Sequence, residues 1–524
     1  MGSFVHYAPG GAHATDAAMR PSRKVAGDSM TGSNLNNTRS DSAPKHAKHY
    51  RTSHTLRTAI TCFVLAIIAF ILCFAGSVYA QLNGKISSTS VGFIDQDSGS
   101  GDTKNDTLDP YDGQSITILI LGQDTRDGAA NAALGGGELA NEHQADTTIV
   151  AQISADRSYI NLVSIPRDSI VDRPSCKMSD GSTLAAEDGV MFNSIFATAY
   201  SQGGDLASAA SCAVHSVNYL TGLNINQFVV VDFAGMSEMV NALGGVDICL
   251  PTDVDDAYSG LKLSAGVQHL DGTQATQYAR TRHGLGDGSD IMRTTRQQYL
   301  IKRLIRTALQ KNIVSQSNQL YQFALSALNN LSLSSGLASA STLVGLASTL
   351  TNLDVNRIYS RTIPITSSHD DQYRVVWDDS AADIWKLLRD GNPLQTDATS
   401  SDASSDTSSS SSDTSSAASG DDSSSAEETS PDTSSEPSAS DDSSSNSVDL
   451  STMTAQQRID YYTAQGGTYD ATTQVITTAD GTLIDPGTDG TVDPSDGTIR
   501  DPNTGYATGI SYGYLTATFC PTLQ

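Results

Sequence analysis

Short apolar runs and longer helical patterns follow one another between about residues 114 and 392. Three runs rich in β-branched residues come first, bounded by polar loops, and predict strands at 116–122, 147–153 and 159–165. Further strands are predicted at 228–232 and 246–250, and helical patterns lie at about 206–221, 234–243, 272–279 and 291–312. Strands and helices mixed in one segment predict a layered α/β sheet domain.

An uncharged apolar stretch at 58–80 is long enough to cross a bilayer as one helix. Segment 1–57 carries more basic than acidic residues and is predicted to be a disordered cytoplasmic segment, which places everything after Gln81 outside the cell. The alternative is a signal peptide cleaved near Ala80. The apolar run exceeds the ~7 to 15 residues of a signal-peptide core, which favours a retained single-pass anchor in the cell membrane.

Composition divides the remainder of the chain. A Gly/Ser/Asp-rich spacer is predicted at 81–113, and a disordered Ser/Asp-rich linker at 393–449, where apolar residues are too few to form a core. Much of the net charge of −27 belongs to this linker. Segment 450–524 has a helical pattern near 455–465 and two similar turn-rich phrases, at 484–488 and 500–504. It is either a small β-rich module or a loosely ordered tail of unknown role, and the linker would let it move well away from the main domain.

Six cysteines are compatible with this orientation. Cys62 and Cys73 lie in the predicted span, where a thiol behaves as a small apolar group. The other four are Cys176, Cys212, Cys249 and Cys520. In an oxidising compartment they predict one or two disulfides among three pairings, of which we favour Cys176 with Cys212. Their spacing does not suggest a zinc site.

Two acids and an arginine lie next to the ends of the first three predicted strands. Asp124 follows the first strand, Asp146 precedes the second and Arg167 follows the third. If the strands form an antiparallel meander, all three residues fall at one rim of the sheet. The carboxylates could hold a divalent metal, act as a general acid/base pair or be solvated loop acids. Mg²⁺ needs only one or two protein carboxylates when phosphate oxygens complete its shell, so a nearby arginine favours a metal site for a phosphate ester.

Basic residues gather in one short stretch of a chain that has only 31 Lys+Arg against 58 Asp+Glu. They are Arg280, Arg282, Arg293 and Arg296, accompanied by Gln297. Guanidinium groups donate paired charge-assisted bonds to phosphate, so several that converge can hold a diphosphate. The alternative is structural ion pairing or a solvated helix face. We expect Lys302, Arg303 and Arg306 to form the outer charged face of the helix predicted at 291–312.

Local signals position this cluster. Asp271 and Gln274 form a predicted capping box at the start of the helix that ends near Arg280. A glycine-rich loop at 283–289 then leads to a second helix, at whose start Asp290 is expected to act as a cap. The chain has no H-E-x-x-H, G-x-S-x-G or G-x-x-x-x-G-K-[ST] motif. Its basic stretches lack interleaved aromatic residues, so nucleic-acid binding is not expected.

The phrases around these residues closely resemble, in order, those of the LytR-CpsA-Psr family of bacterial envelope enzymes. They are Leu121–Arg126, Ala145–Thr147, Ser164–Asp168, Leu243–Asp247, Leu270–Gly272, Tyr278–Arg282 and Arg293–Gln298. The ordered set, which spans about residues 115 to 309, carries the resemblance. It implies a central mixed β-sheet flanked by helices, with an apolar pocket for a lipid chain, in an extracellular domain at 114–392.

The resemblance further implies a magnesium-dependent phosphotransferase that moves a glycopolymer from a polyprenyl diphosphate carrier to peptidoglycan, forming a phosphodiester link. Asp124 and Asp146 would bind Mg²⁺ or Mn²⁺. The residues implied to bind the diphosphate are Arg126, Arg167, Arg280, Arg282, Arg293 and Gln297. The implied catalytic residues are Asp124, Asp146, Arg167, Arg280, Arg282 and Asp290, the last near the metal or acceptor as a candidate base.

Two further features of the resemblance concern the rim of the sheet. Asn193 and Tyr200 resemble a family Asn-x-Ala-Tyr region, although local packing explains them equally well. Gln144 stands where many members have an arginine, which removes one cationic contact. Two other functions remain open: hydrolysis of polyprenyl diphosphates at the same site, and a wall-binding or regulatory membrane protein without catalysis.

Overall fold

The computed structural model describes residues 60–70, 72–73, 76–77, 80, 90–96, 113–135, 143–310, 331–338, 342, 346, 349–350, 353–371, 373–395, 450 and 453–523. The chain divides into two compact units, Met1–Cys73 and Phe74–Gln524. In the first unit, residues 60–70 are helical. Over the described parts of the chain, no helix combines the length and apolar character that a membrane span requires. The span predicted at 58–80 falls partly outside the described residues, as do nearly all of segments 1–57 and 393–449 and much of 81–113, so these remain predictions.

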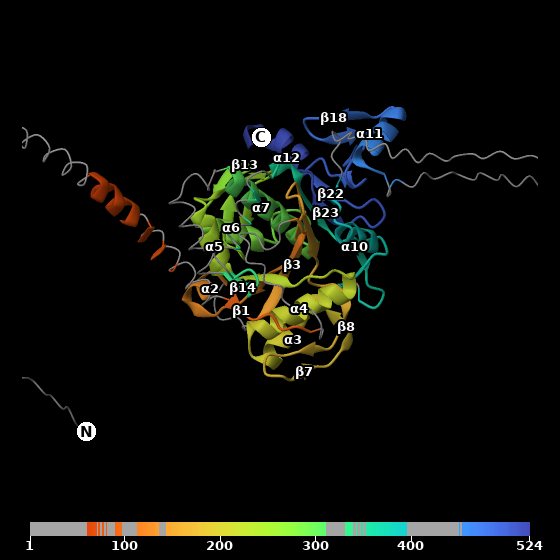
Figure 1. The fold of residues 1–524 in the computed structure, drawn as a ribbon. Helices are drawn as coiled ribbons and strands as arrows, with labels where there is room; N and C mark the ends of the chain where they lie inside the picture. The colour runs from red at the N-terminus through yellow and green to blue at the C-terminus, as the bar shows by residue number, and fades with distance from the viewer. Residues whose placement is uncertain are drawn as a thin grey trace, which may run out of the picture. The chain divides into compact units, whose positions relative to one another are not determined.

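A seven-stranded mixed sheet forms the centre of the second unit (Figure 1). Its strands, in spatial order, are β1 (Ser90–Val91), β14 (Leu331–Ser334), β9 (Gln227–Val231), β2 (Ile116–Asp124), β3 (Gln144–Ile153), β4 (Ile160–Ile165) and β15 (Ile358–Thr362). Strands β2, β3 and β4 form the predicted antiparallel meander, while β9 and β15 run parallel to β2 and β4. Every residue of β4 is buried, because both faces of the sheet are covered and the strand can be apolar throughout.

Helices cover the two faces of the sheet. Helices α3 (Phe192–Gly203), α4 (Leu206–Thr221) and α10 (Ala381–Arg389) share a core with side chains that alternate along β2 to β4, such as Leu119, Val150 and Val163. The side chains that point to the opposite face of these strands, such as Ile149 and Leu162, pack with α7 (Asp290–Gln310). The alternation of apolar side chains to two cores produces the layered α/β fold that the sequence predicts.

Smaller elements surround the rim of the sheet. The helices are α2 (Gly128–Gly135), α5 (Phe233–Ala242), α6 (Gly272–Arg280) and η2 (Val355–Arg357). The strands form two-stranded pairs: β5 (Ile170–Arg173) with β8 (Glu187–Met191), β6 (Cys176–Lys177) with β7 (Thr183–Leu184), β10 (Val246–Leu250) with β13 (Gly266–Leu270), β11 (Val254–Asp256) with β12 (Leu261–Leu263), and β16 (Ile365–Ser367) with β17 (Val375–Trp377). The predicted helices at 206–221, 234–243 and 272–279 are confirmed as α4, α5 and α6 within one residue at each end. The helix predicted at 291–312 is confirmed as α7 up to Gln310, beyond which its predicted end lies outside the described residues. The capping box of Asp271 and Gln274 is also present.

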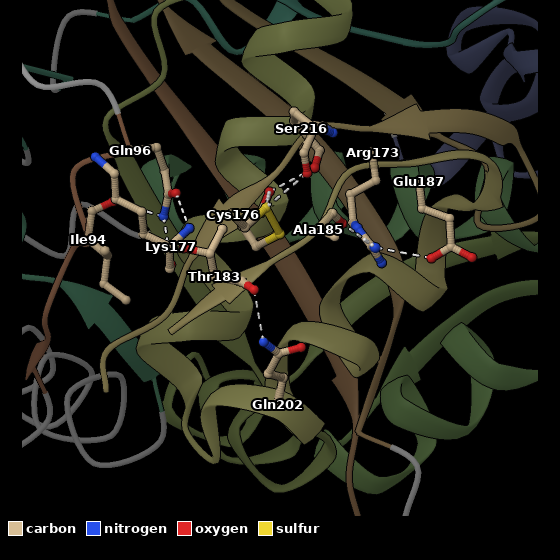
Figure 2. The surroundings of a disulfide bond; sticks show 12 residues. Ile94, Gln96, Arg173, Cys176, Lys177, Thr183, Ala185, Glu187, Gln202 and Ser216 are labelled. Atoms are coloured by element: carbon tan, nitrogen blue, oxygen red, sulfur yellow. Dashed lines mark hydrogen bonds and ion pairs between the residues drawn. A yellow bond between two sulfur atoms is a disulfide. The ribbon is translucent and has the colours of Figure 1, made fainter. Parts of the chain in front are cut away.

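The favoured disulfide between Cys176 and Cys212 is confirmed, and it joins β6 to α4. Figure 2 shows its surroundings, where Arg173 donates to the carbonyl of Ala185 and pairs with Glu187 at 3.0 Å. The disulfide therefore fixes the segment that runs from β5 to β8 against α4.

The C-terminal segment is an ordered β-rich module, which confirms the first of the two interpretations of 450–524. Six strands pair antiparallel in chain order: β18 (Thr468–Asp470), β19 (Val475–Thr477), β20 (Leu483–Ile484), β21 (Thr491–Val492), β22 (Thr498–Arg500) and β23 (Ala507–Ile510). Helix α11 (Ala455–Ala464) precedes them, and α12 (Tyr512–Phe519) and η4 (Pro521–Leu523) follow. Asp485, Asp493 and Asp501 each accept a backbone N–H two or three residues ahead, which closes the repeated turns.

This module packs on the main domain, so the prediction of a tail that moves far from it is wrong. A second disulfide joins Cys249 of β10 to Cys520, after α12. The Tyr512 ring lies against α7, with the Arg306 guanidinium 4.4 Å and the Lys302 ammonium 5.6 Å from its centroid. The prediction that Lys302, Arg303 and Arg306 form a solvated outer face is also wrong, because the module covers that face and leaves both arginines buried.

Candidate functional site

The meander brings Asp124, Asp146 and Arg167 to one rim of the sheet, as the strand order predicts. Asp124 ends β2, Asp146 lies near the start of β3, and Arg167 follows β4. The Arg167 Nη1 donates to Asp146 Oδ2 at 2.8 Å. A β-bulge between Gly122 and Gln123 shifts the register beside Asp124. Such irregularities commonly redirect side chains at the edge of a functional site.

Asp290, the first residue of α7, is the centre of an arginine cluster. Its Oδ1 lies 2.7 Å from Arg293 Nη2, 2.9 Å from Arg282 Nη2 and 3.1 Å from Arg167 Nε. The side chain is only 13% exposed, and its other oxygen is buried without a hydrogen bond. The prediction that Asp290 caps the helix is wrong: the Ser289 hydroxyl accepts the N–H of Met292, so the Asp290 carboxylate is free to hold the guanidinium groups together.

Two more arginines face the Asp124 side. The Arg126 Nη2 lies 3.6 Å from Asp124 Oδ1. Arg280 donates to the carbonyl of Leu134, and its guanidinium lies 4.7 Å from the centroid of the Phe233 ring. The backbone bond and the ring hold the Arg280 guanidinium in place at this rim.

Gln297 and Arg296 connect the site to its supports. The amide of Gln297 accepts from the Thr147 hydroxyl at 2.9 Å and donates to the carbonyl of Ala279 at 3.0 Å. Arg296 points away from the arginine cluster and donates to the carbonyls of Thr281 and Leu285. Gln297 therefore ties the end of α6 to β3, and Arg296 holds the glycine-rich loop that follows α6.

The electrostatics differ from one arginine of the site to the next. Burial alone would lower the pKa of Arg167, but Asp290, Asp146 and Asp168 raise it above its ordinary value. Burial lowers the pKa of Arg282, and the neighbouring Arg293 and Arg167 lower it further. Burial likewise lowers the pKa of Arg280. Burial alone would raise the pKa of Asp146, but Arg167 and Arg293 bring it below its ordinary value. An anion at this rim would relieve the repulsion among the guanidinium groups.

Asp124 and Asp146 are the two carboxylates that the sequence predicts as ligands of a divalent cation. The pKa of Asp124 is raised by burial and, in addition, by the nearby charge of Asp146. A cation between the two would offset both effects. Over the described residues no group of three or more His, Cys, Asp or Glu side chains converges, so phosphate oxygens and water would have to complete the shell, as Mg²⁺ permits.

Asn193, which the sequence left ambiguous, contacts the site. Its amide donates to Gln144 at 3.1 Å and to Asp146 Oδ1 at 3.5 Å. Gln144, which stands where an arginine is common in the family, is therefore part of this hydrogen-bonded group. Tyr200 instead stacks on His143, with ring centroids 4.0 Å apart. Sequence reasoning missed Thr147 and Phe233, and only the position of Thr147 beside Asp146 gave a signal.

Comparison with known proteins identifies the family of the chain. The sequence model of the LytR_cpsA_psr family matches residues 82–390. The cell wall biosynthesis protein LcpA of Corynebacterium glutamicum is 26% identical over 330 residues, 60% of this chain and 61% of that protein. The polyisoprenyl-teichoic acid–peptidoglycan teichoic acid transferase TagU of Enterococcus faecalis is 30% identical over 217 residues, 41% of this chain and 60% of that protein.

The chain thus spans about 60% of the length of these two relatives. The crystal structure of Bacillus subtilis TagV is 22% identical to it, with a TM-score of 0.40, over 53% of this chain and 96% of that one. The C-terminal module lies outside the matched residues, whereas the whole arginine and carboxylate cluster lies within them. Because the matched region exceeds half of its length, the chain belongs to the LytR_cpsA_psr family.

Proposed function

We propose that the chain is a membrane-anchored phosphotransferase that moves a glycopolymer from a polyprenyl diphosphate carrier to peptidoglycan. The observation that carries the proposal is the Asp290 carboxylate, 13% exposed, which holds the guanidinium groups of Arg167, Arg282 and Arg293 within 3.1 Å of one oxygen. Relatives named as teichoic acid transferases support the same activity. The anchor is the apolar stretch at 58–80, with the main domain outside the cell.

In this mechanism the arginines bind the diphosphate. Arg167, Arg282 and Arg293 form one side of the site, and Arg126 and Arg280 form the other, so the two phosphoryl groups can each meet a guanidinium. Asp124 and Asp146 would hold Mg²⁺ or Mn²⁺, which when bound supplies positive charge to the phosphoryl oxygens. Fixed charges of this kind stabilise the transition state of phosphoryl transfer more than they stabilise the ground state.

The bond changes balance without a nucleotide. A hydroxyl oxygen of the peptidoglycan sugar forms a bond to the phosphorus nearer the glycan, and the bond from that phosphorus to the bridging oxygen breaks. The electron pair and, overall, the hydroxyl proton leave with polyprenyl phosphate. One oxygen of Asp290 contacts three guanidinium groups, so we assign Asp290 the positioning of the arginines in preference to proton transfer.

The test uses the full chain in detergent with a short polyprenyl diphosphate glycan, peptidoglycan oligomers and Mg²⁺. Mass spectrometry measures the phosphodiester-linked product. We expect product from the wild type, its loss in Asp146→Ala and Arg282→Ala, and its retention in Arg500→Ala, which removes an arginine from the C-terminal module. Free glycan phosphate without a linked product would favour a hydrolase. Bound lipid with no turnover in any variant would favour a wall-binding protein.

A further inference from the structure

Two exposed aromatic rings lie beside the arginine cluster and have no part in the mechanism above. Tyr258, between β11 and β12, is 86% exposed. Its ring centroid lies 4.7 Å from that of His283, at an interplanar angle of 44°. His283 directly follows Arg282, whose guanidinium contacts Asp290. An aromatic pair that faces solvent next to a reaction centre is a surface that a ligand can cover.

A single buried carboxylate fixes this pair in place. Asp256 is 2% exposed, and its Oδ1 accepts the backbone N–H of Tyr258 at 2.9 Å. Its Oδ2 accepts the N–H groups of Arg282 at 3.2 Å and His283 at 3.4 Å. One side chain therefore binds the β11–β12 hairpin to the loop that follows α6, and it sets the distance between the aromatic pair and Arg282.

The loop beneath the rings is held from a second side. Arg296 donates to the carbonyls of Thr281 and Leu285, and the Thr281 hydroxyl lies 2.8 Å from that of Ser259. The backbone of His283 is thus anchored before and after, while its side chain stays exposed. A rigid aromatic surface loses little conformational entropy when a ligand binds to it.

We propose that Tyr258 and His283 form a sugar-binding subsite on which a pyranose ring of the substrate glycan stacks. The C–H groups on one face of a pyranose are apolar and pack on the negative face of an aromatic ring, while its hydroxyl groups need polar partners at the edge. Asp255 and Lys262 form an exposed ion pair on the same β11–β12 hairpin, with their charged ends 2.6 Å apart. The proposal rests on the proposed function, which brings sugar to this rim. The ring belongs either to the lipid-linked glycopolymer or to the peptidoglycan acceptor.

The experiment measures binding by the full chain in detergent, without turnover. One arm titrates soluble peptidoglycan oligomers, a second titrates the polyprenyl diphosphate glycan, and a third titrates inorganic diphosphate. We expect Tyr258→Ala to weaken one sugar arm by roughly three- to tenfold, the range for one aromatic contact, and to leave the diphosphate arm unchanged. Tyr258→Trp should restore binding. The affected arm identifies the source of the sugar.

Tyr219→Ala is the matched control. Tyr219 is 63% exposed on α4, which leads into β9 at the opposite end of the sheet from Asp124. Melting temperatures of all variants would verify that each is folded. Unchanged sugar binding in Tyr258→Ala and His283→Ala, or a wild type that binds diphosphate and neither sugar ligand, would overturn the subsite and leave the proposed function standing. A wild type that binds none of the three ligands would overturn both.

Discussion

Replacing Asp290 by asparagine tests the centre of the site most directly. The substitution keeps the size of the side chain and one oxygen acceptor but removes the charge that Arg167, Arg282 and Arg293 share. We expect the variant to be less stable than the wild type, because the three guanidinium groups would then repel one another across a mostly buried space.

The magnitude follows from the exposure of each partner. Breaking a buried ion pair costs about 3 to 5 kcal/mol, whereas an exposed pair contributes about 1 kcal/mol or less. The side chain of Arg293 is 8% exposed, that of Arg167 is 19% and that of Arg282 is 36%, so the first two account for most of the loss. A loss of about 3 kcal/mol corresponds to a fall of several degrees in melting temperature.

Inorganic diphosphate should reverse the defect. With one carboxylate fewer, the arginines attract an anion more strongly, and a ligand that binds only the folded state raises its stability. We therefore expect diphosphate to raise the melting temperature of Asp290→Asn more than that of the wild type, in thermal scans at matched ionic strength. Turnover should still fall, since the arginines lose the carboxylate that orients them.

Asp287→Asn serves as the control, because Asp287 is exposed in the same loop and its carboxylate accepts the backbone N–H of Ser289. It should leave both the melting temperature and the diphosphate response close to those of the wild type. The reasoning is refuted if Asp290→Asn melts with the wild type and shows an equal response to diphosphate.

Three further variants test the surroundings of the site. The double variant Cys249→Ser with Cys520→Ser removes a disulfide between residues 271 apart in sequence. From loop-closure entropy, the bridge stabilises the folded state by about 5 kcal/mol at most. Without it, the C-terminal module should become sensitive to limited proteolysis. Burial and the nearby Arg306 lower the pKa of Lys302 from 10.5 to about 8. Between these two pH values the unfolded chain binds more protons than the folded chain, so the stability of the protein should rise with pH. In urea denaturation, Lys302→Met should show a smaller rise than the wild type. A Cβ on Gly122 would lie 2.8 Å from the Thr147 Cβ, so Gly122→Ala should cost about 1 to 3 kcal/mol in the same assay, and an unchanged midpoint would contradict the close packing of β2 on β3.

The sequence predicted those elements whose signals are local. The β-branched runs identified β2, β3 and β4, and the capping box identified the start of α6. Helix α3 was missed because its N-cap is Met191, whose side chain makes no capping bond. Strands β14 and β15 join the sheet from distant parts of the chain, and no local pattern indicates which neighbour a strand will pair with.

Within the site, the sequence identified the charged residues but not which groups each of them contacts. Arg293 and Arg296 are three residues apart on α7, and both are nearly buried. Only the rotation of the helix in the fold directs Arg293 to Asp146 and Arg296 to the carbonyl of Leu285 in the glycine-rich loop. For Asp290 the favourable position at a helix start suggested a cap, but Ser289 performs that role and three guanidinium groups compete successfully for the carboxylate.

Helix α7 connects the arginine cluster, inside the family match, to the C-terminal module outside it. Its first turns carry Asp290 and Arg293, and Arg303, about 15 Å further along by helical rise, donates to the Tyr512 hydroxyl at 2.6 Å. Tyr299, between these points, accepts the backbone N–H of Cys249, the residue bridged to Cys520. The C-terminal module thus immobilises the far half of the helix whose near end holds the arginines. Since a helix moves largely as a rigid body, the module restricts the position of Asp290 and Arg293, the residues of α7 that we propose to act at the diphosphate.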